Sequence, residues 1–207
     1  MEETIRDKLI PAVIGRHVSD IERRIISLPV RYGGLGIADP TITAHREYEA
    51  SCLITEDLVN LISHQEQDLS LLNTEEITEK IKALKNAKEA FYTEQFEDIK
   101  VQIEDVTLKR CLDFSKEKGS GAWLTALPLQ DHGFCLNKQE FRDAVCLRYG
   151  WRIPNTPQHC GCGAVNTINH TLICKKGGFV SMRNNALRDL NAKIQSSSGT
   201  KWGNFSK

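Results

Sequence analysis

The chain has 207 residues, no formal net charge, 40% hydrophobic residues and 26% charged residues. This composition is typical of a soluble globular protein with one or two domains. No run of eighteen apolar residues occurs, which excludes a transmembrane helix, and the acidic start "MEETIRDKLI" has no apolar core of a secretion signal. We therefore expect an intracellular protein, in the cytoplasm or nucleus, that does not bind membranes.

The charge is distributed unevenly along the chain. Residues 1–60 and 61–118 have net charges of −3 and −4, whereas residues 119–207 contain 11 Lys and Arg against 4 Asp and Glu, a net charge of +7. A polyanion would be attracted to the basic part. Any contact with nucleic acid is therefore expected in the C-terminal part of the chain.

Apolar spacing and capping residues predict helices from the N-terminus onward. Residues 2–15 space their apolar side chains as a helix does, with an interruption at Pro11. Ser19 and Glu22 form a capping box, which opens a short helix to Leu28.

A glycine-rich segment follows, with the sequence "LPVRYGGLGIADP". Its glycines and prolines predict a loop that packs closely. Asp39 is the expected N-cap of the next helix and Pro40 its first residue, and this helix runs towards Leu61. Residues 1–64 are expected to form one helical region.

Residues 65–118 are predicted to be a long, charged, amphipathic helix or a pair of helices. Asn73 and Glu76 form a second capping box at its start. The apolar stripe changes face between Phe91 and Phe96, which are five residues apart. Either one helix bends there or two helices meet.

Residues 119–194 are expected to be a further helical region. Asn137 and Glu140 form a third capping box, and a last helix is predicted at about 180–194. The polar residues 195–207 are expected to be a disordered tail. The predicted fold class is therefore mainly α.

Three cysteines and one histidine lie within fifteen residues, in the pattern Cys-x-Cys-x7-His-x3-Cys. Thiolate and imidazole are the ligands that zinc prefers in tetrahedral structural sites. Four such ligands close the coordination shell, and the sequence has no His-Glu-x-x-His motif, so the zinc is predicted to be structural rather than catalytic. The sequence predicts a small zinc knuckle at about 158–178, with the ligands Cys160, Cys162, His170 and Cys174.

The residues between the ligands fit this hypothesis. Gly161 and Gly163 permit a tight turn that brings the first two sulfurs together, and the last two ligands, four residues apart, share one helical face. Asn166 or Thr167 is the expected cap of that helical turn. His159 is a possible substitute ligand.

The alternative interpretation is that the cysteines are simply buried. Free cysteine is among the most buried residue types. We expect that role for the other four cysteines, which lie on or near predicted helices: Cys52, Cys111, Cys135 and Cys146. An odd total of seven cysteines favours a reducing compartment over a disulfide framework.

Basic residues follow the predicted knuckle and are candidates for contacts with phosphate. Ordinary solvated charge is the alternative for each of them. The candidate nucleic-acid-binding residues are Lys175, Lys176, Arg183, Arg188 and Lys193.

Two segments resemble proteins of retrotransposons. "LPVRYGGLGIADP" resembles the segment after the polymerase core of their reverse transcriptases, which implies a thumb-like role for residues 1–64. "AWLTALPLQDHGFCLNKQEFRDAVCLRYGW", with the knuckle and "CKKGGFVSMRNNALRDL" after it, resembles the C-terminal region of retroelement proteins that carry a restriction-enzyme-like endonuclease. In that family a Cys-Cys-His-Cys knuckle precedes the nuclease. The resemblance implies that the knuckle and the basic helix with Arg183, Arg188 and Asp189 position template RNA or target DNA.

The catalytic motifs of that family are missing. No Asp-Asp pair, which would hold magnesium in a polymerase, occurs in the sequence. Arg183-Asn184-Asn185-Ala186 replaces the family's Arg-His-Asn-Glu, and the acidic residues of a nuclease core would lie beyond Lys207. We therefore expect a truncated retroelement piece that is not an enzyme.

The predicted function is non-catalytic binding of RNA or DNA with low sequence specificity. The alternative is a helical protein–protein interaction scaffold in which zinc is purely structural. A continuous basic face beside the knuckle would favour the first hypothesis. Scattered basic residues with exposed apolar surface would favour the second.

Overall fold

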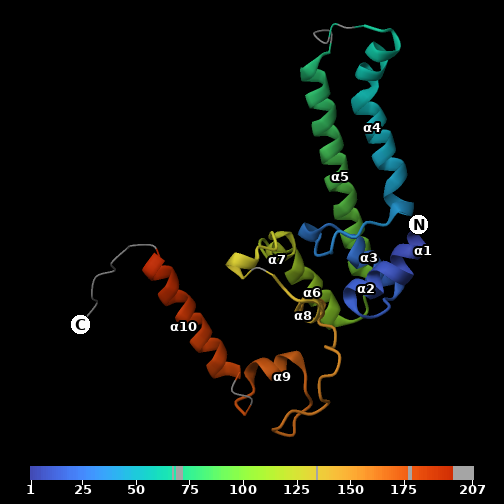
Figure 1. Cartoon of the computed structure of the whole chain (residues 1–207). Helices are drawn as coiled ribbons and strands as arrows, with labels where there is room; N and C mark the ends of the chain where they lie inside the picture. The colour runs from blue at the N-terminus through green and yellow to red at the C-terminus, as the bar shows by residue number, and fades with distance from the viewer. Residues whose placement is uncertain (67, 69–71, 134, 177–178, 198–207) are drawn as a thin grey trace. The chain divides into compact units, whose positions relative to one another are not determined.

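Figure 1 shows the computed structural model of the chain. It describes residues 1–66, 68, 72–133, 135–176 and 179–197. The described part is mainly helical and contains no strand, as predicted. The chain forms two compact units, Met1–Trp151 and Arg152–Lys207, and their boundary falls inside the expected region 119–194.

The first unit contains most of the helices, some of them very short. In chain order they are α1 (Glu2–Thr4), the π-helical turn η1 (Ile5–Leu9), α2 (Ile10–Ile14), α3 (Asp20–Ser27), the 3-10 turn η2 (Val30–Tyr32), α4 (Pro40–Ser63), α5 (Thr74–Gln102), α6 (Val106–Lys116), α7 (Ala122–Thr125), the 3-10 turn η4 (Gln130–His132) and α8 (Lys138–Tyr149). The second unit contains α9 (Ile168–Ile173) and α10 (Phe179–Ser197). No described helix combines the length and the apolar character needed to cross a bilayer.

The expected interruption at Pro11 does not stop the first helix. Proline removes one helical hydrogen bond, and its ring collides with the carbonyl four residues earlier in a regular α-helix. The π-helical turn η1 lies directly before α2 and widens the backbone there. The helical path therefore continues to Gly15, which caps it with a φ of 93°.

Helix caps lie where the sequence places them. The capping boxes that open α3 and α8 are both complete. Asp39 caps α4, and Pro40 is its first residue. At α5, Asn73 accepts the backbone N–H of Glu76 at 3.2 Å, but the Glu76 carboxylate lies 3.2 Å from Lys80 Nζ, so this box is only half formed.

The glycine-rich loop packs closely, as predicted. A Cβ atom on Gly34 would lie 1.9 Å from the carbonyl oxygen of Leu28, so only glycine fits there. The N–H of Gly36 donates to the same carbonyl at 2.9 Å. From α8, the Tyr149 hydroxyl donates to the carbonyl of Gly33 at 3.0 Å, which fixes the loop to the core.

A buried ion pair joins the N-terminal helix to the end of this loop. The Arg23 side chain is almost completely buried, and its guanidinium lies 2.7 Å from the Glu2 carboxylate. It also donates to the carbonyls of Ile37 at 2.8 Å and Ala38 at 3.1 Å. Arg23 of α3 therefore links the N-terminal helix, through Glu2, to the end of the glycine-rich loop, through the carbonyls of Ile37 and Ala38.

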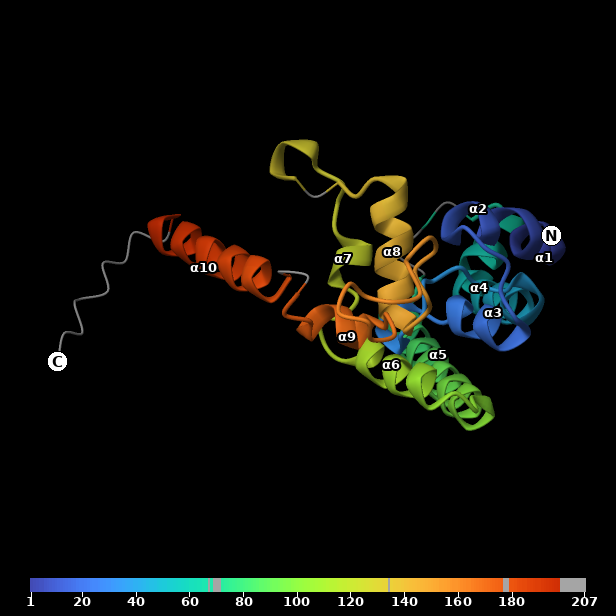
Figure 2. The ribbon, with the colours of Figure 1, turned by 90° about the horizontal axis from the view of Figure 1, so that it is seen from below.

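The core of the first unit lies where α2, α3, α5, α6 and α8 meet, and Figure 2 shows α6 beside α8. Val106 is apolar but exposed, because α5 ends at Gln102 and Val106 begins a new helix. The fully buried side chains are Ile10, Ile25, Ile26, Leu28, Phe96, Ile99, Leu112, Val145 and Tyr149.

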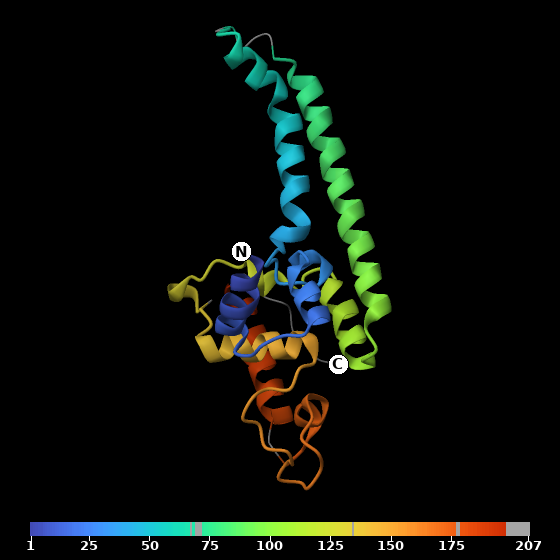
Figure 3. The ribbon, with the colours of Figure 1, turned by 90° about the vertical axis from the view of Figure 1, so that its right-hand side faces the viewer.

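Helices α4 and α5 form an antiparallel hairpin, and both Figure 1 and Figure 3 show them side by side. Of the two alternatives for the change of face near Phe91, the structure shows one continuous helix. Before Phe91, Lys80 and Lys88 of α5 form ion pairs with α4 at 3.1 Å and 2.6 Å, and Arg46 of α4 stacks on the Phe91 ring at 3.7 Å. From Tyr92 onward α5 buries Tyr92, Phe96 and Ile99 in the core.

The close contact at Gly34 predicts an unusual sensitivity to the smallest substitution. Gly34→Ala should lower the free energy of unfolding of the first unit by at least about 2 kcal/mol, because the methyl group collides with backbone rather than with a flexible side chain. Urea denaturation measures this loss. Gly36→Ala is the control, since that site has open space and a φ of 73°, and it should cost only about 1 kcal/mol. Equal losses for both variants would show that the contact at Gly34 is not the constraint.

Candidate metal centre

The first two candidate ligands lie on a narrow loop. His159 and Val165 form an isolated antiparallel bridge at its base. Within the loop, the N–H of Cys160 donates to the carbonyl of Ala164 at 2.9 Å, and the N–H of Gly163 donates to the carbonyl of Cys160 at 2.8 Å. Gly163 has a φ of 93°, which favours glycine, so its predicted role in the turn is confirmed.

The other two candidate ligands lie on α9 and directly after it. Thr167, one of the two expected caps, accepts the N–H of His170 at 3.1 Å. Cys174 follows the last residue of α9, and its N–H still donates to the carbonyl of His170 at 2.8 Å. Because this bond keeps the helical spacing, the imidazole and the thiol stay on one side of α9.

The four side chains converge on a common centre, as predicted. Their ligand atoms all lie within 4.8 Å of one another. Cys160 Sγ is 3.5 Å from Cys174 Sγ, and Cys162 Sγ is 3.2 Å from His170 Nε2. Around a tetrahedral ion with zinc-like bond lengths these separations would be about 3.8 Å and about 3.6 Å. His159 is exposed and does not belong to this group.

Crowding of the thiols affects their ionisation. The backbone N–H of Cys162 lowers the pKa of the Cys160 thiol. The Cys174 thiol, desolvation and the Cys162 thiol all raise this pKa, and together they outweigh the effect of the N–H, so the net shift is upward. Three thiolates so close together repel one another unless a cation lies between them. A divalent ion would reverse this effect and favour the thiolate form.

The second unit has almost no hydrophobic core of its own. Among its described residues only Cys174 is buried. The apolar side chains of α10 are exposed, including Met182, Leu187, Leu190 and Ile194. The ligand group is therefore the main feature that can hold the knuckle together.

The five candidate phosphate contacts are all exposed. On α10, Arg183, Arg188 and Lys193 follow one another at intervals of five residues. Side chains five residues apart point in directions that differ by about 140° around the helix axis. They are therefore spread around α10 and do not form one continuous basic face. Arg188 also lies 3.6 Å from the carboxylate of Asp189.

The remaining cysteines differ from one another in burial. Cys146 is buried and Cys111 half-buried, and burial raises the pKa of both thiols. The expectation of burial is wrong for Cys52 and Cys135, which are exposed. Cys52 lies on α4, a helix with no buried residue, and Cys135 lies in the loop before α8.

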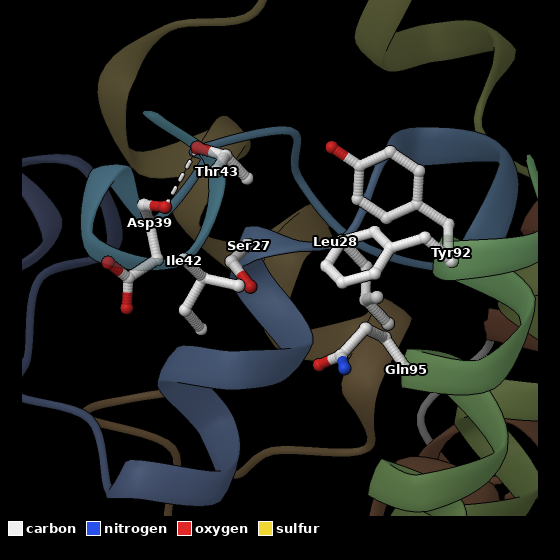
Figure 4. A pocket seen from close by; sticks show the side chains of 8 residues that line it. Ser27, Leu28, Asp39, Ile42, Thr43, Tyr92 and Gln95 are labelled. Carbon is white, nitrogen blue, oxygen red and sulfur yellow. Dashed lines mark hydrogen bonds between the residues drawn. The ribbon is translucent and has the colours of Figure 1, made fainter. Parts of the chain in front are cut away.

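A small hollow lies at the base of the hairpin (Figure 4). Its volume of about 20 Å³ has room for about one water molecule, so it cannot take an organic substrate. Figure 4 shows the side chains that surround it, among them Ser27, Leu28, Asp39, Ile42, Thr43, Tyr92 and Gln95.

Comparisons of this chain with protein-family models, with curated proteins and with solved structures found no match.

The converging ligands predict stoichiometric metal binding. The purified protein should contain about one equivalent of metal, and Cys160→Ser/Cys174→Ser should contain none, since two of four ligands are lost. Elemental analysis after dialysis measures the metal. Cys135→Ser, which changes an exposed cysteine outside the group, should keep the full equivalent. Metal-free protein with three freely reactive knuckle thiols would contradict this prediction.

Proposed function

We propose that the second unit is a structural zinc knuckle that orders a cationic, non-catalytic segment for binding nucleic acid. The donor set supports zinc, because three thiolates and one imidazole suit it better than magnesium or calcium, which prefer oxygen ligands. Four protein ligands would fill a tetrahedral shell. Such a site has no open position for a catalytic water.

The charge of the second unit is the observation that carries this proposal. Residues 152–197 contain six Lys and Arg residues and a single acidic residue, Asp189. A zinc ion with three thiolates adds about −1, so the unit stays strongly cationic. With all five candidate contacts exposed, a phosphate backbone would meet attraction and almost no repulsion.

Low sequence specificity follows from the arrangement of these charges. Basic residues spread around an exposed helix can reach phosphates from several sides. Reading bases requires side chains held in a fixed register against a groove, whereas the described side chains of α10 from Ser181 onward are exposed. RNA and DNA are both acceptable partners on this basis.

The origin of the chain belongs to the same proposal. The resemblance of its segments to retroelement proteins, together with the missing Asp-Asp pair and the Asn184-Asn185-Ala186 sequence, supports a retroelement-type protein without catalytic activity. An intracellular location is consistent with free thiols in a zinc site. Assays for primer extension and for DNA cleavage test the absence of activity.

A second candidate function is supported by a different observation. The basic residues of α10 are scattered and its apolar residues are exposed, which was the criterion for an interaction scaffold. On this hypothesis zinc only stabilises the fold, and the partner is another protein.

The nucleic-acid hypothesis predicts binding that depends strongly on salt. A plot of log K against log salt for double-stranded DNA should have a slope of about −3, because several counterions are released. Lys175→Ala/Lys176→Ala should reduce the slope by about 2, since each lost phosphate contact contributes about 0.9. Fluorescence anisotropy with labelled DNA and RNA measures both values.

Two control variants complete this experiment. Lys82→Ala/Lys85→Ala changes two exposed lysines of the first unit and should leave the affinity unchanged. Cys160→Ser/Cys174→Ser should weaken binding, because the metal no longer orders the segment. Absence of binding at low salt, or binding that salt does not weaken, would end the nucleic-acid hypothesis and leave the scaffold.

A further inference from the structure

The knuckle brings together three of the seven cysteines of the chain. Their sulfurs lie within 4.8 Å of one another and of the imidazole nitrogen. Thiolates that can bind zinc are also nucleophiles towards peroxides, which take two electrons from a pair of thiolates and leave a disulfide. The arrangement of the three thiols therefore decides whether this centre can be oxidised reversibly.

The three thiols differ in their access to solvent. Cys162 is exposed, Cys160 is half-buried and Cys174 is buried. A small oxidant such as hydrogen peroxide can reach the loop of the knuckle, whereas the thiol at the end of α9 is shielded. A shielded thiol beside accessible ones can trap an oxidised sulfur as a disulfide before the sulfur is oxidised further.

The geometry favours a disulfide between Cys160 and Cys174. Their sulfurs are 3.5 Å apart, and an approach of about 1.5 Å brings them to the length of a disulfide bond. The bond would join the loop to the end of α9. It would leave the backbone hydrogen bonds of both segments in place, from Cys160 to Ala164 at 2.9 Å and from Cys174 to His170 at 2.8 Å.

A disulfide between Cys160 and Cys162 is less favourable. The carbonyl of Cys160 accepts the N–H of Gly163 at 2.8 Å, so both cysteines belong to one tight turn. A bond across the single residue between them would close a small ring inside this turn and strain it. The Cys162 sulfur lies instead 3.2 Å from Nε2 of His170.

Other cysteines of the chain are placed less well for this reaction. Burial raises the pKa of the Cys111 and Cys146 thiols, so they stay protonated and unreactive near neutral pH. Cys52 is exposed and contacts the Tyr48 hydroxyl rather than a thiol. Cys135 is exposed in the loop before α8. Oxidation by a peroxide should therefore centre on the knuckle.

Loss of two thiolates would remove the metal from the knuckle. Cys162 and His170 would remain, and two ligands cannot fill a tetrahedral shell. Among the described residues of the second unit only Cys174 is buried, so no core replaces the ion. A disulfide constrains one pair of residues, whereas an ion fixes four side chains, so the oxidised unit is less ordered. The exposed Lys175 and Lys176 follow Cys174 directly and are affected first.

We infer that the knuckle is a redox switch, in which hydrogen peroxide joins Cys160 and Cys174 in a disulfide, zinc is released and the binding of nucleic acid weakens. This inference rests on the proposed function, because it concerns the regulation of the same site. The oxidant is a peroxide, and a thiol reductant with free zinc resets the switch.

The reaction takes two steps. The Cys160 sulfur attacks one oxygen of the peroxide, the O–O bond breaks, and a sulfenic acid and a hydroxide form. The Cys174 sulfur then attacks the Cys160 sulfur, the S–O bond breaks and a second hydroxide leaves. Both hydroxides take protons from solvent, so two thiolates lose two electrons and the peroxide becomes two waters. If the peroxide oxidises Cys162 first, exchange among the three sulfurs leads to the same disulfide.

Zinc release and mass spectrometry test the inference on the full-length, zinc-loaded protein. The test protein contains Cys52→Ser/Cys135→Ser, which removes two exposed thiols outside the knuckle. Excess hydrogen peroxide should release about one zinc per chain, recorded with a chromogenic chelator. Fragmentation of the tryptic peptide 153–175 should show a bond between Cys160 and Cys174. Thiol reductant and added zinc should reverse both changes.

Two single variants form a matched pair of controls. Cys162→Ser and Cys174→Ser each remove one ligand, so they weaken the metal site to a similar degree. Only Cys162→Ser keeps the two thiols that are 3.5 Å apart. Peroxide should therefore form the disulfide in Cys162→Ser and form none in Cys174→Ser.

Fluorescence anisotropy completes the test. The affinity of the oxidised protein for labelled DNA should fall to that of Cys160→Ser/Cys174→Ser and recover after reduction with zinc. An unchanged affinity would overturn the inference, as would retention of zinc in peroxide, a disulfide between Cys160 and Cys162, or sulfinic acids that a reductant does not reverse. Reduced protein that binds no nucleic acid would end the proposed function alone, since zinc release and the disulfide are measured without nucleic acid.

Discussion

The second unit depends on the convergence of three thiols and one imidazole. Their ligand atoms lie within 4.8 Å of one another, in a unit whose described residues include only one buried side chain, Cys174. Burial of apolar surface normally provides most of the stability of a fold, and here that contribution is nearly absent. A bound ion would replace it, because metal binding in such small units is also folding free energy. The helix that follows, α10, exposes its described side chains from Ser181 onward and adds no buried apolar side chain to the unit.

The first unit is stabilised by different means. Its glycine-rich loop lies against the end of α3 with no space for a side chain at Gly34, and Tyr149 and the buried Arg23 fix the two ends of the loop. Helices α2, α3, α5, α6 and α8 bury a continuous apolar core around it. The packing constraint at one glycine and the metal centre are therefore separate sources of order in one chain. A change in either one should affect its own unit first.

Local chemistry made much of this predictable. N-caps act over two or three residues and the four ligands lie within fifteen residues, so the caps of α3, α4 and α8 and the four ligands could be placed from the sequence. Burial depends on distant contacts and was harder to predict. Val106 is apolar but begins a helix on the surface, and Cys52 is exposed because it lies on α4, which buries none of its residues. The π-helical turn before Pro11 has no sequence pattern of its own and became visible only in the structure.

The length of the hairpin affects how the size of this protein is measured. With 29 residues α5 is about 43 Å long, which exceeds the diameter of about 38 Å expected for a compact domain as large as the first unit. The part of α5 before Tyr92 extends from the core as an arm, which raises the frictional coefficient of the first unit and favours early elution from a gel-filtration column. Elution volume alone would then suggest a dimer. Static light scattering, which reports mass without reference to shape, avoids this error.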